Sequence, residues 1–215
     1  IARFKAIRPI RDKVHLVATR PYYSYKKNVL KAKLQDNPFT FLRIINPEFN
    51  SPVKTKVNSD GRFKLVNEQY QEFIEKNILI QDEQPKLYLY RQSKGNTSSI
   101  GVIGGASVQE YLNDDIKKHE ATLTTREEIF TRYLDIVGYN AEPVLISYKG
   151  NLDINNFISS LVNSRPEYEF STTDLIKHEL WILEDDDADQ FEKLFKQIPC
   201  TYIADGHHRS ASSAR

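Results

Sequence analysis

Cysteine is nearly absent from this sequence of 215 residues, since Cys200 is the only one, and a disulfide within the chain is therefore excluded. No stretch approaches the roughly 20 consecutive apolar residues that a membrane-spanning helix requires. The first residues are charged and lack the apolar core of a secretory signal peptide. We therefore expect a cytoplasmic protein that makes no contact with a membrane.

The chain also lacks an excess of either charge, with 30 basic and 29 acidic residues and a formal net charge of +1. A nucleic-acid-binding surface usually shows as a basic excess, so we expect a small-molecule substrate rather than nucleic acid as the partner. Methionine is absent altogether, and the chain stops at Arg215, soon after its strongest motif. These two features predict a fragment of a longer protein, truncated at its C-terminal end.

What the sequence does contain is enough apolar material for a folded core. Apolar residues make up 40% of the chain, which includes 12 Tyr and 11 Phe. Segments with helical periodicity alternate irregularly with short apolar runs, which favours an α+β fold with a mixed sheet. We predict helices at about 25–35, 61–76, 125–138, 153–163 and 186–197. We predict strands at 13–17, 39–45, 86–92, 98–104, 143–148, 167–172, 176–183 and 200–204, and a loop at 50–60.

The strongest functional motif is the run from Asp205 to Arg209, which follows the last predicted strand. Gly206 permits a tight turn, and the free N–H groups of a following helix favour phosphate. Arg209 can hold phosphate oxygens, His207 and His208 can donate hydrogen bonds, and Asp205 can hold a metal ion such as Mg²⁺. The alternatives are a structural turn with surface histidines and a zinc site.

A second block surrounds Glu120, which follows His119 and precedes a predicted helix. A carboxylate in that position could act as a general base toward a hydroxyl group. An exposed charged turn is the alternative interpretation.

Four further residues are weaker candidates for substrate binding. Arg20, Tyr22 and Glu48 lie in predicted loops after strands, where sites are often built. His178 lies within a predicted strand, so it could instead be a core or cross-strand histidine. Cys200 is expected to be buried and inert at the start of the last strand.

The chain resembles, from end to end, a bacterial and archaeal family of proteins of unknown function whose full members are longer. The resemblance rests on short motifs spread along the sequence, and the last of them is the most specific. These motifs are Ala6-Ile7-Arg8-Pro9, Arg20-Pro21-Tyr22, Asn37-Pro38, His119-Glu120-Ala121-Thr122 with Arg126, His178-Glu179-Leu180-Trp181 and Ala204-Asp205-Gly206-His207-His208-Arg209.

Part of the chain is also similar to the free-serine kinases of the ParB/sulfiredoxin-like superfamily. In both, a His-Glu pair precedes a helix, a Gly turn and a Pro-Val-Leu strand, here 143–145, and an Asp-Gly-His-His-Arg loop follows. This resemblance implies that Glu120 activates the acceptor hydroxyl, with His119, His207 and His208 beside it. It also implies that the loop 205–209, with Arg126, binds ATP or ADP and Mg²⁺.

The resemblance suggests how the chain is organised. Residues 1–110 would form an additional N-terminal α/β region. Residues 111–215 would form a ParB/serine-kinase-like core with an insertion at about 149–199, because about fifty residues separate the Pro-Val-Leu strand from the motif, more than in the kinases.

Three functions follow from the sequence. The first is a nucleotide-dependent phosphoryl-transfer enzyme, possible substrates being free serine or a similar small hydroxylated metabolite. The second is a ParB-like nucleotide-binding module that acts on DNA or in regulation without kinase activity. The third is a nuclease or a non-catalytic binding protein, and the lack of a nuclease-type acidic cluster argues against the nuclease.

Overall fold

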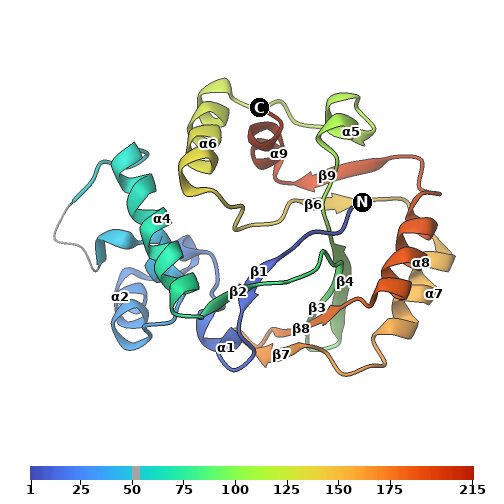
Figure 1. Ribbon diagram of the computed structural model, residues 1–215, viewed down its shortest axis with the longest axis horizontal. Coiled ribbons are helices and arrows are strands. Elements are labelled where there is room, and N and C mark those ends of the chain that lie inside the picture. Colours follow the sequence, from blue (N-terminus) through green and yellow to red (C-terminus); the bar gives the residue numbers. More distant parts are fainter. Residues whose placement is uncertain (50–53) are drawn as a thin grey trace.

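A computed structural model describes residues 1–49 and 54–215 of the chain. Its helices and strands confirm the predicted α+β class (Figure 1). Within the described residues the strands form three sheets, with the orders β1-β2, β4-β3-β8-β7 and β5-β9-β6. The loop predicted at 50–60 lies partly outside the described residues, and residues 54–59 carry neither helix nor strand. No helix of the described residues has the length and apolar character needed to span a bilayer.

One hydrophobic core lies among helices. It is built around α4 (Asp60–Glu75), which begins where the Ser59 hydroxyl accepts a hydrogen bond from the backbone N–H of Arg62. α6 (Thr124–Val137) packs against α4, and α2 (Lys27–Asp36) lies on the same side of the molecule (Figure 1). The buried residues of this core are Val17, Ile44, Phe63, Val66, Tyr70, Phe73, Ile78, Leu79 and Val137.

Two predicted strands in this region are wrong. Residues 13–17 and 39–45 contain the short helices α1 (Val14–Val17) and α3 (Leu42–Ile45). A short apolar run does not distinguish a strand from a buried helical turn. In these two segments the tertiary contacts favour the helical conformation. Val17 accepts a hydrogen bond from the N–H of Phe41 through its carbonyl, which ties the two segments together beside α4.

A second core lies between the four-stranded sheet and two helices. The strands predicted at 86–92 and 98–104 are confirmed, and they form a hairpin of β3 (Tyr88–Lys94) and β4 (Thr97–Ile103). The strands predicted at 167–172 and 176–183 are confirmed as the antiparallel pair β7 (Tyr168–Ser171) and β8 (Lys177–Ile182). α7 (Leu152–Leu161) and α8 (Asp185–Phe195) pack on the sheet face that carries Leu89 and Trp181.

The four-stranded sheet combines distant parts of the chain. β3 pairs antiparallel with β8, so residues 88–93 lie beside residues 177–182. The segment 149–199 therefore contributes two strands to a sheet that it shares with the N-terminal region. The predicted boundary near residue 110 remains a prediction.

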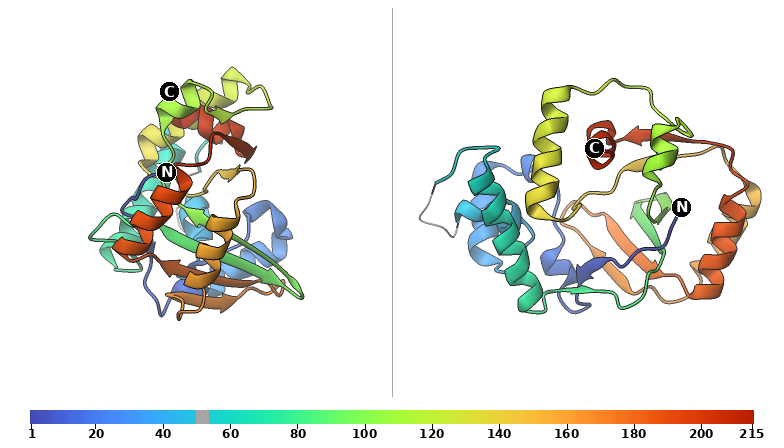
Figure 2. Two further views of the ribbon diagram at one scale, coloured as in Figure 1. Left: turned by 90° about the vertical axis from the view of Figure 1, so that its right-hand side faces the viewer. Right: turned by 45° about the horizontal axis from the view of Figure 1, so that its top comes forward.

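The last two sheets are smaller. β1 (Ile7–Pro9) pairs antiparallel with β2 (Leu79–Gln81). β9 (Thr201–Asp205) is the central strand of the other sheet, parallel to β5 (Ile116–Lys117) and antiparallel to β6 (Leu145–Ser147). α9 (His207–Ser213) follows β9 and packs against α6 (Figure 2). This junction of β9 and α9 carries the strongest sequence motif.

Candidate functional site

The motif forms a strand, a one-residue turn and a helix, as predicted. β9 ends at Asp205 and α9 begins at His207, with Gly206 between them at φ 100°. That left-handed conformation favours glycine. A Cβ atom at this position would also lie 3.2 Å from the guanidinium of Arg209, so a larger residue would disturb the arginine as well as the backbone.

Parallel pairing of β5 and β9 brings the second block to the motif. Ile116 is opposite Thr201 and Lys117 is opposite Tyr202, so the residues after β5 reach the same end of the sheet as Asp205. Glu120 Oε2 lies 3.6 Å from Nδ1 of His207. The ring of His119 meets that of His207 edge-on, with 4.3 Å between centroids. The structure therefore places Glu120 and the loop 205–209 at one site.

His207 and Glu120 differ sharply in their access to solvent. The His207 side chain is 4% exposed, whereas that of Glu120 is 59% exposed. Nε2 of His207 and Nδ1 of His208 are buried and have no hydrogen-bond partner among the described residues. The site therefore combines an open carboxylate with buried ring nitrogens whose hydrogen-bonding capacity is unused.

Arg209 is held by groups of the chain itself. Its Nη2 lies 2.5 Å from Oδ2 of Asp205, and its Nη1 donates to the carbonyl of Pro143 at 2.7 Å. Nη1 also lies 3.4 Å from Oε2 of Glu142. The two carboxylate side chains are 70% and 67% exposed. A phosphate would therefore compete with exposed carboxylates for this guanidinium.

Sequence reasoning missed Glu142 as part of this site. It precedes the strand β6, whose antiparallel pairing with β9 puts Leu145 opposite Asp205. The signal available in the sequence was its position just before the Pro-Val-Leu strand that the resemblance had singled out.

α9 is fixed to α6 through a serine. Ser212 Oγ lies 3.4 Å from the carbonyl of Glu127 in α6, and Thr131 of α6 donates from its hydroxyl to the Ser212 carbonyl at 3.4 Å. The N-cap of α6 is Leu123, and both Thr124 and Thr125 lie within the helix.

Arg126 lies in the first turn of α6 with an exposed side chain. Among the described residues no hydrogen bond or ion pair of its side chain reaches the loop 205–209. A role of Arg126 in phosphate binding therefore stays a prediction.

The four weaker candidates lie in other parts of the fold. Tyr22 is in the short helix η1 (Tyr22–Ser24) and is 55% exposed. The Arg20 guanidinium stacks over Tyr25 at 4.7 Å. Glu48, in η2 (Pro47–Phe49), accepts from the backbone N–H of Thr55 at 2.9 Å. Hydrogen bonds from Thr55, with the nearby guanidinium of Arg62, lower the pKa of Glu48.

His178 has the surroundings of a cross-strand histidine. Its Nδ1 lies 2.7 Å from the hydroxyl of Tyr90, and its Nε2 lies 3.2 Å from Oγ1 of Thr172. Its ring stacks on Phe170 at 5.0 Å, and burial lowers its pKa. Cys200, expected to be buried, is partly exposed and lies near the Tyr202 hydroxyl.

The donor set suits Mg²⁺ only together with a phosphate ligand. Within residues 1–49 and 54–215 no three His, Cys, Asp or Glu side chains form a cluster that could hold a metal ion by themselves. Mg²⁺ commonly binds through one or two carboxylates and substrate phosphates. Asp205, with its exposed carboxylate, fits that mode.

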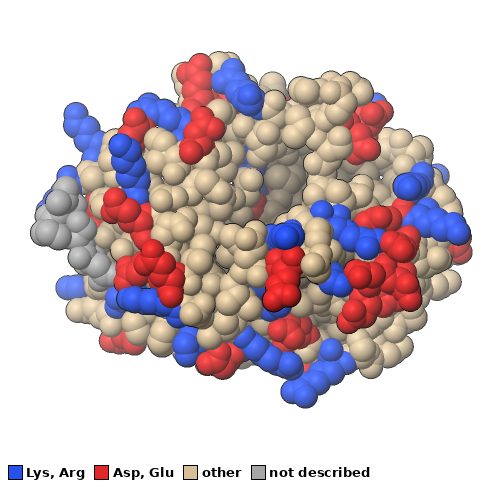
Figure 3. Space-filling model, viewed as in Figure 1, with Lys and Arg blue, Asp and Glu red and all other residues tan. Residues whose placement is uncertain are grey.

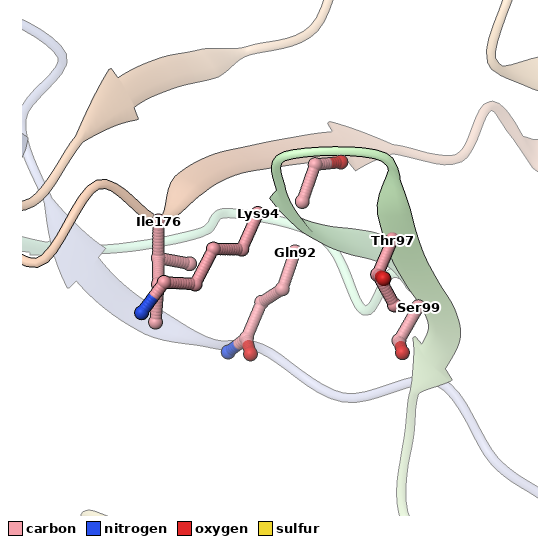
Figure 4. Close-up of a pocket in the computed structure, with 6 residues that line it drawn as sticks. Gln92, Lys94, Thr97, Ser99 and Ile176 are labelled. Atoms are coloured by element: carbon pink, nitrogen blue, oxygen red, sulfur yellow. The ribbon is translucent and has the colours of Figure 1, made fainter.

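The candidate site is open rather than enclosed. Figure 3 shows a hollow between α6 and the β6–β9 sheet. Two cavities of the described residues lie elsewhere: one of about 660 Å³ beside β7, and one of about 140 Å³ at the β3–β4 hairpin (Figure 4). The smaller cavity is below the usual size of a ligand site.

Comparison with known proteins assigns a family but no activity. The family model described as "Protein of unknown function (DUF1015)" matches residues 1–215. No curated protein and no solved structure matches the chain.

Proposed function

The chain belongs to the DUF1015 family, whose description names no activity, and we propose that it is a nucleotide-dependent phosphoryl-transfer enzyme acting on a small hydroxylated metabolite. In this proposal Glu120 is the general base, and the loop 205–209 binds the phosphates of ATP or ADP. Free serine is the proposed acceptor, by resemblance to the ParB/sulfiredoxin-like kinases, and the core of residues 111–215 would share their fold.

The observation that carries the proposal is the short distance between the two predicted blocks. Glu120 Oε2 lies 3.6 Å from the His207 ring, although the residues are 87 positions apart (207 − 120). Phosphoryl transfer needs a base and a phosphate cradle within the width of one substrate, because its catalysis is mainly positioning and charge stabilisation. The closeness of Glu120 to the loop 205–209 supports the proposal on this point.

The proposed reaction assigns a role to each group of the chain. The acceptor hydroxyl oxygen forms a bond to the terminal phosphorus, and the bond from that phosphorus to the remaining nucleotide breaks. The hydroxyl proton passes to the carboxylate of Glu120. His207 and His208 donate hydrogen bonds to phosphate oxygens. Bound Mg²⁺, held by Asp205, would neutralise charge on the phosphates.

Arg209 can exchange partners when a nucleotide binds. In the free protein its guanidinium is paired with Asp205 and Glu142. A phosphate could take the place of the Asp205 carboxylate on the arginine, and Asp205 would then be free to hold Mg²⁺. Ion pairs between exposed groups contribute only about 0–1 kcal/mol, so this exchange costs little.

The test is calorimetry of the chain with Mg²⁺ and either ATP or ADP. We expect saturable binding that Arg209→Gln weakens by about tenfold or more, because a guanidinium–phosphate contact is lost. Arg132→Gln, which removes an exposed arginine of α6 paired with Asp60, is the matched control. Absence of binding at millimolar nucleotide would refute the proposal.

The second candidate is a nucleotide-binding regulatory module without kinase activity. The observation that favours it is the neutralisation of Arg209 by two carboxylates of the chain, which a bound nucleotide would disrupt. Nucleotide binding without phosphorylation of serine or other hydroxylated acceptors would support this candidate. A salt-dependent DNA mobility shift would show whether the module acts on DNA.

A further inference from the structure

The larger cavity lies along the outer edge of the four-stranded sheet. It measures about 660 Å³, which is within the size range of ligand sites. Seven consecutive residues, 165–171, form one wall. Successive side chains of a strand point to opposite faces of the sheet, so a wall that includes every residue follows the backbone edge rather than one face.

The cavity follows the outermost strand of the sheet. The strand order β4-β3-β8-β7 makes β7 outermost, and β8 is its partner within the described residues. α1 lies beside β7 (Figure 1), and its Val14 and His15 also line the cavity, hereafter called the groove. A free strand edge can pair with an additional strand through its backbone.

The charged residues of the groove leave a positive excess. Glu167 is paired with Arg8 at 3.2 Å, and Glu169 is paired with Lys177 at 2.8 Å. Arg11 also lines the groove and lies 3.8 Å from Glu167, whereas the lining residues Arg165 and His15 have no ion-pair partner in the part of the chain that is described. The carboxylates of the groove are therefore neutralised, while Arg165 remains available to an acidic ligand.

We propose that this groove binds an extended peptide segment carrying acidic side chains, which adds to the sheet as a strand beside β7. Backbone hydrogen bonds along residues 168–171 would provide the contact, and Arg165 would select for acidic residues. The opposite edge, β4, is the internal comparison. It is longer and exposed, and the hollow at its hairpin measures only about 140 Å³.

The experiment uses a blocked, fluorescein-labelled octapeptide of alternating threonine and glutamate, and the same peptide with lysine in place of glutamate. Threonine favours an extended conformation. Fluorescence anisotropy with the whole chain should show saturable binding of the acidic peptide and at least about tenfold weaker binding of the basic one. Hydrogen exchange should slow at residues 168–171 and remain unchanged at 97–103.

Two substitutions make the outcome specific. Arg165→Glu should weaken the acidic peptide by about tenfold or more, whereas Lys94→Glu, the same charge change at the β3–β4 hairpin, should leave it unchanged. The proposal is overturned if neither peptide binds at millimolar concentration, or if both bind equally. Protection of β4 instead of β7, or insensitivity to Arg165→Glu, would overturn it as well.

Discussion

Two histidines, one in the four-stranded sheet and one at the β9–α9 junction, differ in how their ring nitrogens are satisfied. His178 has a hydrogen-bond partner at each nitrogen, Tyr90 and Thr172. His207 is more deeply buried, yet its Nε2 has no partner among the described residues, and its Nδ1 lies 3.6 Å from a carboxylate. Buried polar groups are normally paired, so an unpaired one calls for an explanation.

The hydrogen bonds around His178 determine its protonation. Gln92 donates from Nε2 to the hydroxyl of Tyr90 at 2.9 Å, so the Tyr90 proton is free to go to Nδ1 of His178. The ring proton is then on Nε2 and is donated to Thr172, whose hydroxyl donates to the carbonyl of Ile176. Every donor has an acceptor, which identifies this histidine as part of the fold. The unpaired nitrogen of His207 has no such role among the described residues, and in the proposed function it lies in the nucleotide site.

The largest expected effect concerns the proposed catalytic site, where Glu120 lies beside His207. Glu120→Gln should lower phosphoryl-transfer turnover by about 10²–10⁴-fold, because the amide cannot accept the acceptor's proton. Nucleotide binding should persist, since the amide keeps the shape of the side chain. Turnover and calorimetry on the same preparation check both statements, with Glu75→Gln on the exposed end of α4 as control. If turnover survives in Glu120→Gln, the carboxylate is not the base.

The contribution of the His178 hydrogen bonds to stability is tested by His178→Phe. A phenyl ring keeps the stack on Phe170 but removes both hydrogen bonds, which leaves the Tyr90 hydroxyl without its acceptor. We expect the free energy of unfolding to fall by about 1–3 kcal/mol. Denaturant unfolding followed by circular dichroism measures the change. An unchanged stability would show that the network around His178 contributes nothing.

The matched substitution His207→Phe should have a smaller effect on stability. Its Nε2 has no hydrogen bond to lose, and its contact with the exposed Glu120 contributes little. Phenylalanine also preserves the edge-on contact with His119. We expect the free energy of unfolding to change by less than about 1 kcal/mol, while affinity for nucleotide falls. A stability loss as large as that of His178→Phe would contradict the contrast between the two sites.

Sequence patterns predicted those parts of the fold that depend on local chemistry. The β3–β4 hairpin, α4 and the β9–α9 turn each rest on residues within one segment, such as Gly206 with its positive φ. The strands expected at 13–17 and 39–45 failed because their apolar residues serve the α4 core, which no local pattern reveals. Arg91 and Glu179 form a two-point ion pair across 88 positions, which needs the fold to be known.

Only part of the candidate site could likewise be predicted from local sequence. Asp205, Gly206 and Arg209 belong to one motif that could be identified without a structure. The approach of Glu120 depends on parallel pairing of β5 with β9, and the contacts of Arg209 with Glu142 and Pro143 depend on β6. Sequence alone could offer Glu120 as a candidate, but it could not tell that His207 lies beside it with one nitrogen unpaired.

The smallest expected effect is a pH dependence that belongs to His178. Burial lowers its pKa below the ordinary value of 6.5, so near and just below that pH the unfolded chain binds more protons than the folded one. Stability must then rise with pH in this window, and it must fall as pH decreases from 6.5 through the folded pKa. Unfolding measured between pH 5 and pH 7, a window from about 1.5 units below to about 0.5 unit above the ordinary histidine value, should show this slope. His178→Phe should reduce the slope. If the variant shows the same slope, the pH dependence of stability comes from other groups. Protonation of His178 would then not distinguish it from His207.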